Sequence, residues 1–255
     1  MAVDLSRRDE FAVITLNRPD ALNALNTQMI RDIGAAIDEA AASDARALLF
    51  IGAGGRAFCA GADIKELLGR SLIEAKRGAE LGQRTFAKLD SLPMPSVAVI
   101  NGFAFGGGLE LALACTFRVA PPTAKMGLPE IKLGAIPGYG GTQRLPRVIG
   151  EARALEIIMT GRTVAAAEAE RIGLINRIVE GEPLDGAIAF AREFAGFSLP
   201  VLGLAREAVM RASDLPIAEG LKVEADLNTL AFQTEDVVEG MSAFVEKREA
   251  KFKDA

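Results

Sequence analysis

Two glutamates and a run of glycines in the middle of the chain form a pattern that could do chemistry. Glu110 follows three consecutive glycines, residues 106–108, and Glu130 comes 20 residues later. A glycine run that opens an apolar helix leaves unpaired backbone N–H groups at the positive end of the helix dipole, where an oxyanion would be stabilised. The pattern therefore predicts proton transfer by two carboxylates beside a stabilised oxyanion.

The sequence contains no histidine, and this narrows the chemistry. A Ser-His-Asp triad, a Cys-His dyad and an imidazole metal site are all excluded. General acid–base catalysis at neutral pH must then fall to carboxylates. We expect burial or a neighbouring like charge to raise the pKa of one glutamate toward the working pH.

Each glutamate also has a purely structural interpretation. Glu110 stands near the start of an apolar helix, where a carboxylate can simply stabilise the helix dipole, and Glu130 follows Pro129 as a common first-turn residue. A charged residue in a setting as apolar as that of Glu110 rarely lacks a partner or a function. A catalytic role is therefore favoured for Glu110, whereas the pattern around Glu130 alone is weaker evidence for such a role.

Two further glycine segments have both a functional and a structural explanation. Residues 134–141 include four glycines, which could bring backbone N–H groups close to a ligand or could form a plain irregular connection. Residues 52–57 match the loose G-x-G-x-x-A form of a dinucleotide fingerprint. No long helix follows them directly, so nicotinamide binding is rejected.

The composition is typical of a globular protein, and the sequence has no cluster of basic residues that would indicate nucleic-acid binding. The 255 residues are 50% hydrophobic and carry a formal net charge of −5, and their Lys and Arg residues are scattered rather than clustered. Cys59 and Cys115 lie in apolar stretches, and without a histidine base we expect them to be buried small apolar groups in a reducing compartment. No metal site or disulfide framework is expected.

The start of the chain and one apolar stretch bear on localisation. A strand-like segment over residues 11–16 leaves no room for a secretory signal peptide, so we expect a cytoplasmic protein, or a mitochondrial matrix protein if this is a processed form.

Residues 97–114 are long enough to be tested as a membrane span. Asn101, Glu110 and four glycines interrupt them, so a buried strand, a glycine turn and a buried helix are expected, and no membrane partner.

Strand-like and helical segments alternate along the chain, which predicts an α/β fold with parallel crossovers. After residue 151, Thr163 is expected to be the N-cap of a helix over residues 164–171, and Gly173 to end it. We divide the chain into a core, residues 1–199, and a helical region, residues 200–255, that packs on the body or on another subunit. The expected strands are 11–16, 47–51, 96–100 and 174–179, and the expected helices are 27–42, most of 64–89, 109–114, one from about residue 142, and 152–159.

Together these segments resemble the enoyl-CoA hydratase/isomerase family, also called the crotonase family, and most resemble its 2-enoyl-CoA hydratases. The similarity runs nearly from end to end. It is carried by residues 57–65 (AFCAGADIK), 101–112 (NGFAFGGGLELA), 129–130 (PE), 136–145 (IPGYGGTQRL) and 239–248 (EGMSAFVEKR).

The resemblance implies a spiral of repeated ββα units followed by a helical C-terminal region used for trimerisation, with hexamers as pairs of trimers. It implies an acyl-CoA thioester as substrate and no separate cofactor. Backbone N–H groups of Ala62 and Gly107 would form the oxyanion hole. The residues implied in CoA binding are Ala60, Asp63, Ile64 and Lys65, with Phe244 and Lys247 from the tail, which could reach over from a neighbouring subunit.

The resemblance also implies a reaction, because family hydratases fill both glutamate positions whereas double-bond isomerases commonly keep one. Ionised Glu110 would take a proton from water, and protonated Glu130 would deliver one to the α-carbon, with Gly138 holding the water by its N–H group. Tyr139 departs from the small residue that is more usual in family hydratases. Its ring could narrow the acyl pocket, add a phenol donor or simply pack.

Three functional hypotheses follow. The first is a hydro-lyase that adds water reversibly to 2-enoyl-CoA and gives 3-hydroxyacyl-CoA, in fatty-acid or related acyl-CoA degradation. The second is an isomerase that converts 3-enoyl-CoA into 2-enoyl-CoA. The third, of another class, is a non-catalytic CoA-binding or RNA-binding protein, which the two glutamates and the scattered basic residues disfavour.

Overall fold

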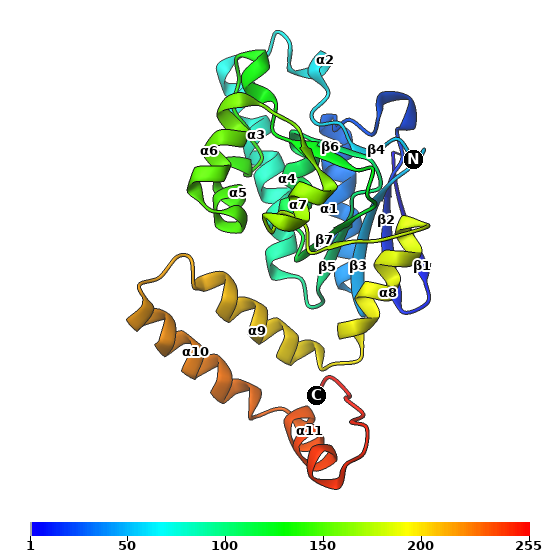
Figure 1. Ribbon diagram of the computed structural model, residues 1–255, viewed down its shortest axis with the longest axis vertical. Helices are drawn as coiled ribbons and strands as arrows, with labels where there is room; N and C mark the ends of the chain where they lie inside the picture. The colour runs from blue at the N-terminus through cyan, green and yellow to red at the C-terminus, as the bar shows by residue number, and fades with distance from the viewer. Residues whose placement is uncertain (1) are drawn as a thin grey trace.

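The larger of two β-sheets forms the centre of the molecule (Figure 1). The structure is a computed structural model that describes residues 2–255. Strand β1 is antiparallel to β2, and the other neighbours in this sheet are parallel, which confirms the predicted α/β class with parallel crossovers. The strand order is β1 (Val3–Arg8), β2 (Phe11–Leu16), β3 (Ala47–Gly52), β5 (Ser96–Val99), β7 (Phe117–Ala120) and β10 (Arg177–Ile178).

The smaller sheet consists of short strands that alternate along the chain with those of the larger one. Its parallel pairs are β4 with β6 and β6 with β8, and β9 joins β8 in antiparallel fashion. Because its strands directly precede the helices and loops of the candidate site, this sheet fixes their positions. The order is β4 (Ala57–Cys59), β6 (Phe103–Phe105), β8 (Lys125–Gly127) and β9 (Val164–Ala165).

Helices cover both faces of the larger sheet. On one face, α8 packs its Ile188 and Phe190 against Val13, Leu49 and Val97 from the strands. On the other face, the core contains residues of α1, α3, α4 and the smaller sheet. The helices of the body are α1 (Thr27–Ala41), α2 (Ile64–Leu67), α3 (Leu72–Ala87), α4 (Gly107–Ala114), α5 (Gly141–Ile149), α6 (Glu151–Thr160), α7 (Ala166–Arg171) and α8 (Pro183–Ala195), with short 3-10 turns η1 (Pro19–Ala21), η2 (Lys88–Ser91) and η3 (Glu130–Leu133).

Local sequence signals explain where several helices begin. The side chain of Asn26 accepts the N–H of Met29 and caps α1, and Ser71 with Glu74 forms a capping box at the start of α3. The prediction that Thr163 caps a helix over residues 164–171 is wrong. Residues 164 and 165 pair with β8 as strand β9, so α7 begins only at Ala166 and has no side-chain cap.

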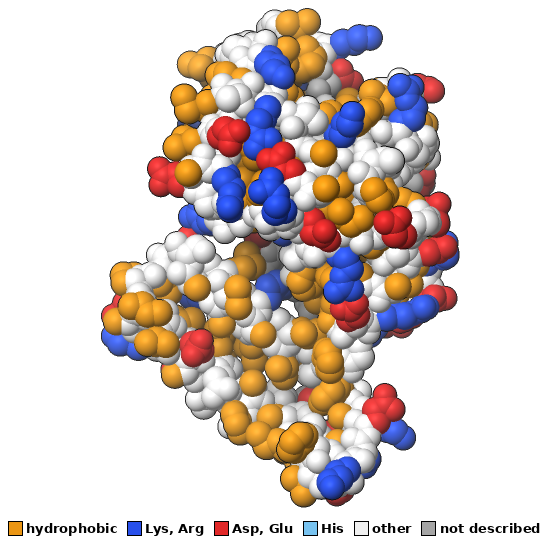
Figure 2. Space-filling view, viewed as in Figure 1, with side chains coloured by type: hydrophobic (Ala, Val, Ile, Leu, Met, Phe, Trp, Pro, Cys, Tyr) orange, Lys and Arg blue, Asp and Glu red, His pale blue; other side chains and the backbone are white. Residues whose placement is uncertain are grey.

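Three helices extend from the body as an arm: α9 (Leu199–Arg211), α10 (Ile217–Ala231) and α11 (Glu235–Glu246) (Figure 1). The arm confirms the prediction of a helical region after Pro200 as far as Glu246, whereas residues 247–255 are not helical. Neither α9 nor α10 has a buried residue, and Figure 2 shows hydrophobic side chains gathered over this part of the molecule. Arg206 ties the arm to the body by donating to the carbonyl of Met94 at 3.1 Å.

The stretch over residues 97–114 contains the expected buried strand, β5, and the expected buried helix, α4, and between them lies a further short strand, β6, that was not predicted. Within residues 2–255 no single helix is long and apolar enough to cross a membrane. One pair of consecutive helices, α8 and α9, meets the length and composition criteria jointly, with a bend of 98° between them.

Candidate active site

The glycine run forms a sharp turn from β6 into α4. Gly106 adopts φ 51°, and α4 begins at Gly107 with every one of its residues buried. A Cβ atom on Gly108 would overlap the carbonyl oxygen of Cys59, so only glycine lets α4 approach β4 this closely. The turn therefore places the start of α4 directly against the end of β4.

The two predicted oxyanion donors lie on adjacent segments. A Cβ atom on Gly61 would lie 3.8 Å from the nitrogen of Gly107, so Ala62 is next to the start of α4. Ala62 forms an isolated parallel bridge with Leu25, in which Gly61 O accepts from Leu25 N at 2.8 Å and Asp63 N donates to Leu25 O at 2.9 Å. In such a bridge the N–H of Ala62 itself faces away from Leu25. The structure thus brings these two backbone positions together.

Glu110 is the most deeply buried carboxylate of this region, with 1% of its surface exposed. Its Oε1 accepts the backbone N–H of Tyr139 at 2.7 Å and that of Gly141 at 2.8 Å. Burial raises the pKa of Glu110 to about 7, and the negative charge of Glu130 adds to this effect, while the N–H donors from residues 139–141 oppose it. Glu110 therefore titrates near neutral pH and anchors the glycine loop to α4.

Glu130, the first residue of η3, reaches over the turn that opens α4. Its Oε1 would lie 3.0 Å from a Cβ atom on Gly106, and its buried Oε2 has no hydrogen-bond partner among the described residues. Burial raises the pKa of this carboxyl group. An oxygen that is buried without a donor favours the protonated form. The structure thus brings both predicted carboxylates to the N-terminal end of one helix.

Tyr139 packs its ring between α3 and α4. A Cβ atom on Gly82 of α3 would overlap the ring, and one on Gly107 would lie 3.0 Å from its Cδ2. Phe86 meets the ring edge-on, with 5.9 Å between the ring centroids. The neighbouring Gly138, the predicted water-binding residue, presents its carbonyl to Nε2 of Gln83 on α3 at 2.9 Å. The loop is therefore held on both sides, by α3 and by α4.

The predicted CoA-binding residues fall into two groups. Ala60, Asp63, Ile64 and Lys65 follow β4 in one continuous segment, in which Asp63 caps α2 and forms an ion pair with Arg18 at 3.1 Å. Phe244 and Lys247 lie in or just after α11, which Figure 1 places at the opposite end of the molecule from α2. Within one chain the structure therefore does not bring the second group to the first.

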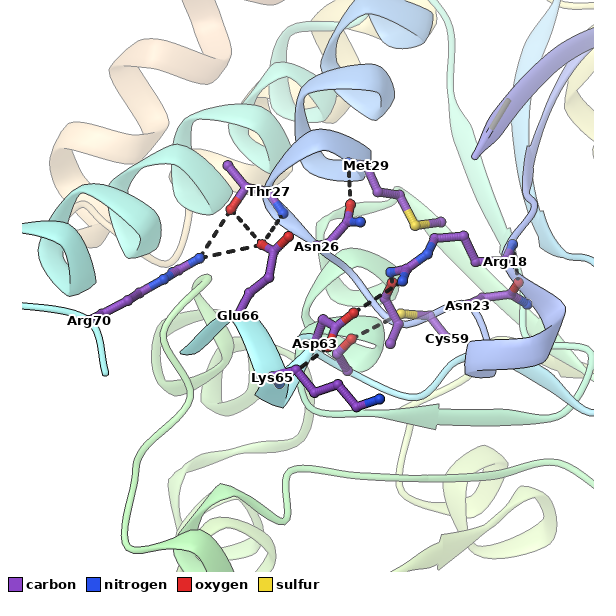
Figure 3. Close-up of polar contacts among 12 residues, drawn as sticks. Arg18, Asn23, Asn26, Thr27, Met29, Cys59, Asp63, Lys65, Glu66 and Arg70 are labelled. Atoms are coloured by element: carbon purple, nitrogen blue, oxygen red, sulfur yellow. Dashed lines mark hydrogen bonds and ion pairs between the residues drawn. The ribbon is translucent and has the colours of Figure 1, made fainter. Parts of the chain in front are cut away.

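Several residues that support the site were not identified from the sequence. Buried Asn23, with φ 59°, donates to the carbonyl of Ala57 at 2.8 Å. Its side chain also accepts the N–H of Arg18 at 2.9 Å (Figure 3). The bond to Ala57 holds the segment before Leu25 against the start of β4. An asparagine inside an apolar Ala-Leu-Asn-Ala-Leu segment was the available signal, because asparagine tolerates positive φ.

A second polar cluster fastens α2 to α1. Glu66 accepts both the N–H and the hydroxyl of Thr27 at 2.8 Å, and Arg70 donates to the same hydroxyl at 3.0 Å. Figure 3 shows Lys65 on the other side of α2, pointing away from this cluster. Across residues 2–255, no three or more His, Cys, Asp and Glu side chains are grouped so that they could hold a metal ion.

Comparisons with known proteins agree with this arrangement. The family model described as enoyl-CoA hydratase/isomerase matches residues 6–255. A Rhizobium meliloti (strain 1021) protein named "Probable enoyl-CoA hydratase" is 47% identical over 94% of this chain and 93% of its own length. A Syntrophomonas wolfei protein named "Crotonyl-CoA hydratase" is 40% identical, over 97% of this chain and 96% of its own.

Solved structures give the same result for the fold. The crystal structure of an enoyl-CoA hydratase from Bacillus anthracis superposes with a TM-score of 0.94 at 36% identity and covers 100% of both chains. One from Geobacillus kaustophilus HTA426 gives a TM-score of 0.94 at 39% identity, over 100% of this chain and 99% of that one. The predicted crotonase-like fold is therefore confirmed, and the chain belongs to the enoyl-CoA hydratase/isomerase family.

Proposed function

We propose that this enzyme adds water reversibly across the 2,3 double bond of a 2-enoyl-CoA and gives the 3-hydroxyacyl-CoA. The observation that carries the proposal is the meeting of two carboxylates at the start of α4. Glu110 is fixed there by two backbone N–H groups, and Glu130 reaches over Gly106. The names of the hydratase relatives support the same reaction.

Substrate activation falls to backbone donors. The thioester oxygen would accept the N–H groups of Ala62 and Gly107, at the positive end of the α4 dipole. These donors would withdraw electrons from the conjugated double bond and make the β-carbon electrophilic. They would also stabilise the enolate character that develops as water adds, which is where the transition state differs most from the substrate.

Proton transfer falls to the two glutamates. Ionised Glu110 takes a proton from the water as its oxygen bonds to the β-carbon, and protonated Glu130 gives its proton to the α-carbon. One proton shared by the pair is what this needs, and it agrees with the raised pKa values of both groups. Gly138, one residue before the N–H that holds Glu110, would help to position the water.

Recognition of CoA is the part of the proposal that involves a second copy. Ala60, Asp63, Ile64 and exposed Lys65 would line the CoA path next to Ala62. Phe244, which is 86% exposed, and Lys247 would complete it from a neighbouring subunit in a homotrimer or homohexamer. The apolar surface of α9 and α10 supports such an assembly. We place the reaction in fatty-acid or related acyl-CoA degradation.

The proposal is tested by product analysis with purified protein. Crotonyl-CoA should yield 3-hydroxybutyryl-CoA, and Glu130→Gln should lower the turnover by a factor on the order of 10² to 10⁴ while butyryl-CoA still binds. Conversion of 3-enoyl-CoA to 2-enoyl-CoA without net hydration would instead identify an isomerase. Full activity of Glu130→Gln would remove that residue from the mechanism.

A further inference from the structure

The ring of Tyr139 occupies the space next to the reacting atoms, and its surroundings leave it no alternative position. Gly107 lies against one side of the ring and Gly82 against the other, and a methyl group at either position would collide with it or press on it. Phe86 packs on the ring at an angle of 90°, with 5.9 Å between the ring centroids. The backbone on either side of the ring is tied to Glu110 and to Gln83. The ring is therefore a fixed wall.

The direction of the acyl chain follows from the donors. With the thioester oxygen at Gly107 and the β-carbon next to Glu110, both ends of the reacting unit lie on α4, and the ring touches Gly107 while its own backbone N–H touches Glu110. Because the ring side chain and the N–H that binds Glu110 belong to the same residue, we take the carbon atoms beyond the β-carbon to run along the Tyr139 ring.

The space beyond the ring is unsuited to an alkyl chain. Burial raises the pKa of the Tyr139 phenol, and the charges of Glu110, Arg70 and Glu66 all act on it. Gly78, one turn before Gly82 on α3, provides the space for the Arg70 guanidinium. Arg70 and Glu66 belong to a cleft of about 550 Å³ between α1 and α3. Its lining is mostly charged and consists of Thr27, Arg31, Glu66, Arg70, Glu74, Arg77, Gly78 and Leu81.

We infer that Tyr139, seated on Gly82, closes the acyl end of the site and restricts the substrate to short 2-enoyl chains of about four carbons. A longer tail would have to displace a ring packed on Gly82, Gly107 and Phe86. It would then enter a cleft with five charged side chains, which would lose water as the tail covered them. This inference rests on the proposed function, because it takes the acyl chain to start at the Gly107 donor.

The test compares crotonyl-CoA with 2-octenoyl-CoA as substrates of the purified full-length enzyme and of Tyr139→Ala. The wild type should prefer crotonyl-CoA in kcat/KM. In Tyr139→Ala the ratio of octenoyl to crotonyl activity should rise by roughly fourfold for each methylene that the vacated space buries, and by up to about 250-fold over the four methylenes that separate the substrates. Tyr139→Phe is the matched control, because it keeps the ring and should keep the wild-type order of chain lengths.

Binding of the saturated thioesters butyryl-CoA and octanoyl-CoA, measured by calorimetry, gives a readout that needs no turnover. If the enzyme hydrates neither substrate but Tyr139→Ala gains octanoyl-CoA affinity, the proposed reaction fails, and only the conclusion that Tyr139 limits the length of the bound acyl chain stands. If hydration occurs and the chain-length order is the same in wild type and Tyr139→Ala by both measurements, the inference is overturned. Tyr139→Leu, which also opens space, replaces the alanine variant should that one fail to fold.

Discussion

Glu110 can be probed with two substitutions that separate its chemistry from its structural role. Its Oε1 accepts the buried N–H groups of Tyr139 and Gly141 at 2.7 and 2.8 Å. A glutamine at position 110 can present its own Oε1 to the same donors, but it cannot take a proton from water. An alanine removes the acceptor, so that both N–H groups stay buried without a partner.

The two variants should therefore lose activity alike and stability unequally. We expect Glu110→Gln to lower the rate by a factor on the order of 10² to 10⁴, which corresponds to about 3 to 5 kcal/mol of transition-state stabilisation. Its free energy of unfolding at pH 8 should not decrease, because the change removes a buried charge. Glu110→Ala should lower that free energy by about 2 to 6 kcal/mol, since each unsatisfied buried donor costs about 1 to 3 kcal/mol.

The rate is measured as loss of the conjugated thioester absorbance with crotonyl-CoA, and the stability by urea unfolding at one protein concentration and pH. Activity of Glu110→Gln within tenfold of wild type would refute the assignment of this residue as the base. Equal stability of the two variants would refute the conclusion that Glu110 anchors the loop over residues 138–141.

Three further predictions follow from the same geometry. Because burial raises the pKa of Glu110 to about 7, kcat/KM should fall about tenfold per pH unit as the pH decreases below that value, and a flat profile would contradict its role. Between pH 4.5 and about 7 the Glu110 carboxyl group keeps its proton in the folded state, whereas the unfolded chain releases it. The free energy of unfolding should therefore decrease as the pH rises through that interval. Glu110→Gln should remove this contribution to the pH dependence of the free energy of unfolding. Gly108→Ala should destabilise the protein by about 1 to 3 kcal/mol in urea unfolding, because its Cβ would overlap Cys59 O. The control, Gly203→Ala in α9, has nothing within 4 Å of the added Cβ and should stabilise the protein by up to about 1 kcal/mol. Equal effects of the two substitutions would show that the close approach of α4 to β4 is unimportant for stability.

The longer elements of the fold could be predicted because their patterns are local. The apolar runs of β2 and β3 and the amphipathic stretch of α1 contain enough residues to reveal a period. Strands β4, β6, β8 and β9 could not be predicted, since two or three residues show no alternation. Their existence depends on pairing partners far along the chain, as the failure of the Thr163 cap illustrates.

The candidate site divides in the same way. The motifs around Glu110 and Glu130 predicted two carboxylates beside a helix start, and the structure brings them there. The bonds from Tyr139 N and Gly141 N to Glu110 span about 30 residues and leave no trace in local sequence. Gly82 is an ordinary helix residue in the sequence, and only the fold places it under the Tyr139 ring. The assembly into trimers or hexamers, and the contacts of Phe244 and Lys247 with CoA, stay predictions.

The central claim is that the two carboxylates at the start of α4 add water to a 2-enoyl thioester. The most direct measurement follows purified enzyme with crotonyl-CoA in water enriched in ¹⁸O and identifies the product by mass spectrometry. The account predicts 3-hydroxybutyryl-CoA with one ¹⁸O at carbon 3, and loss of this product in Glu110→Gln. Unchanged crotonyl-CoA, or an isomerised thioester without label, would contradict it.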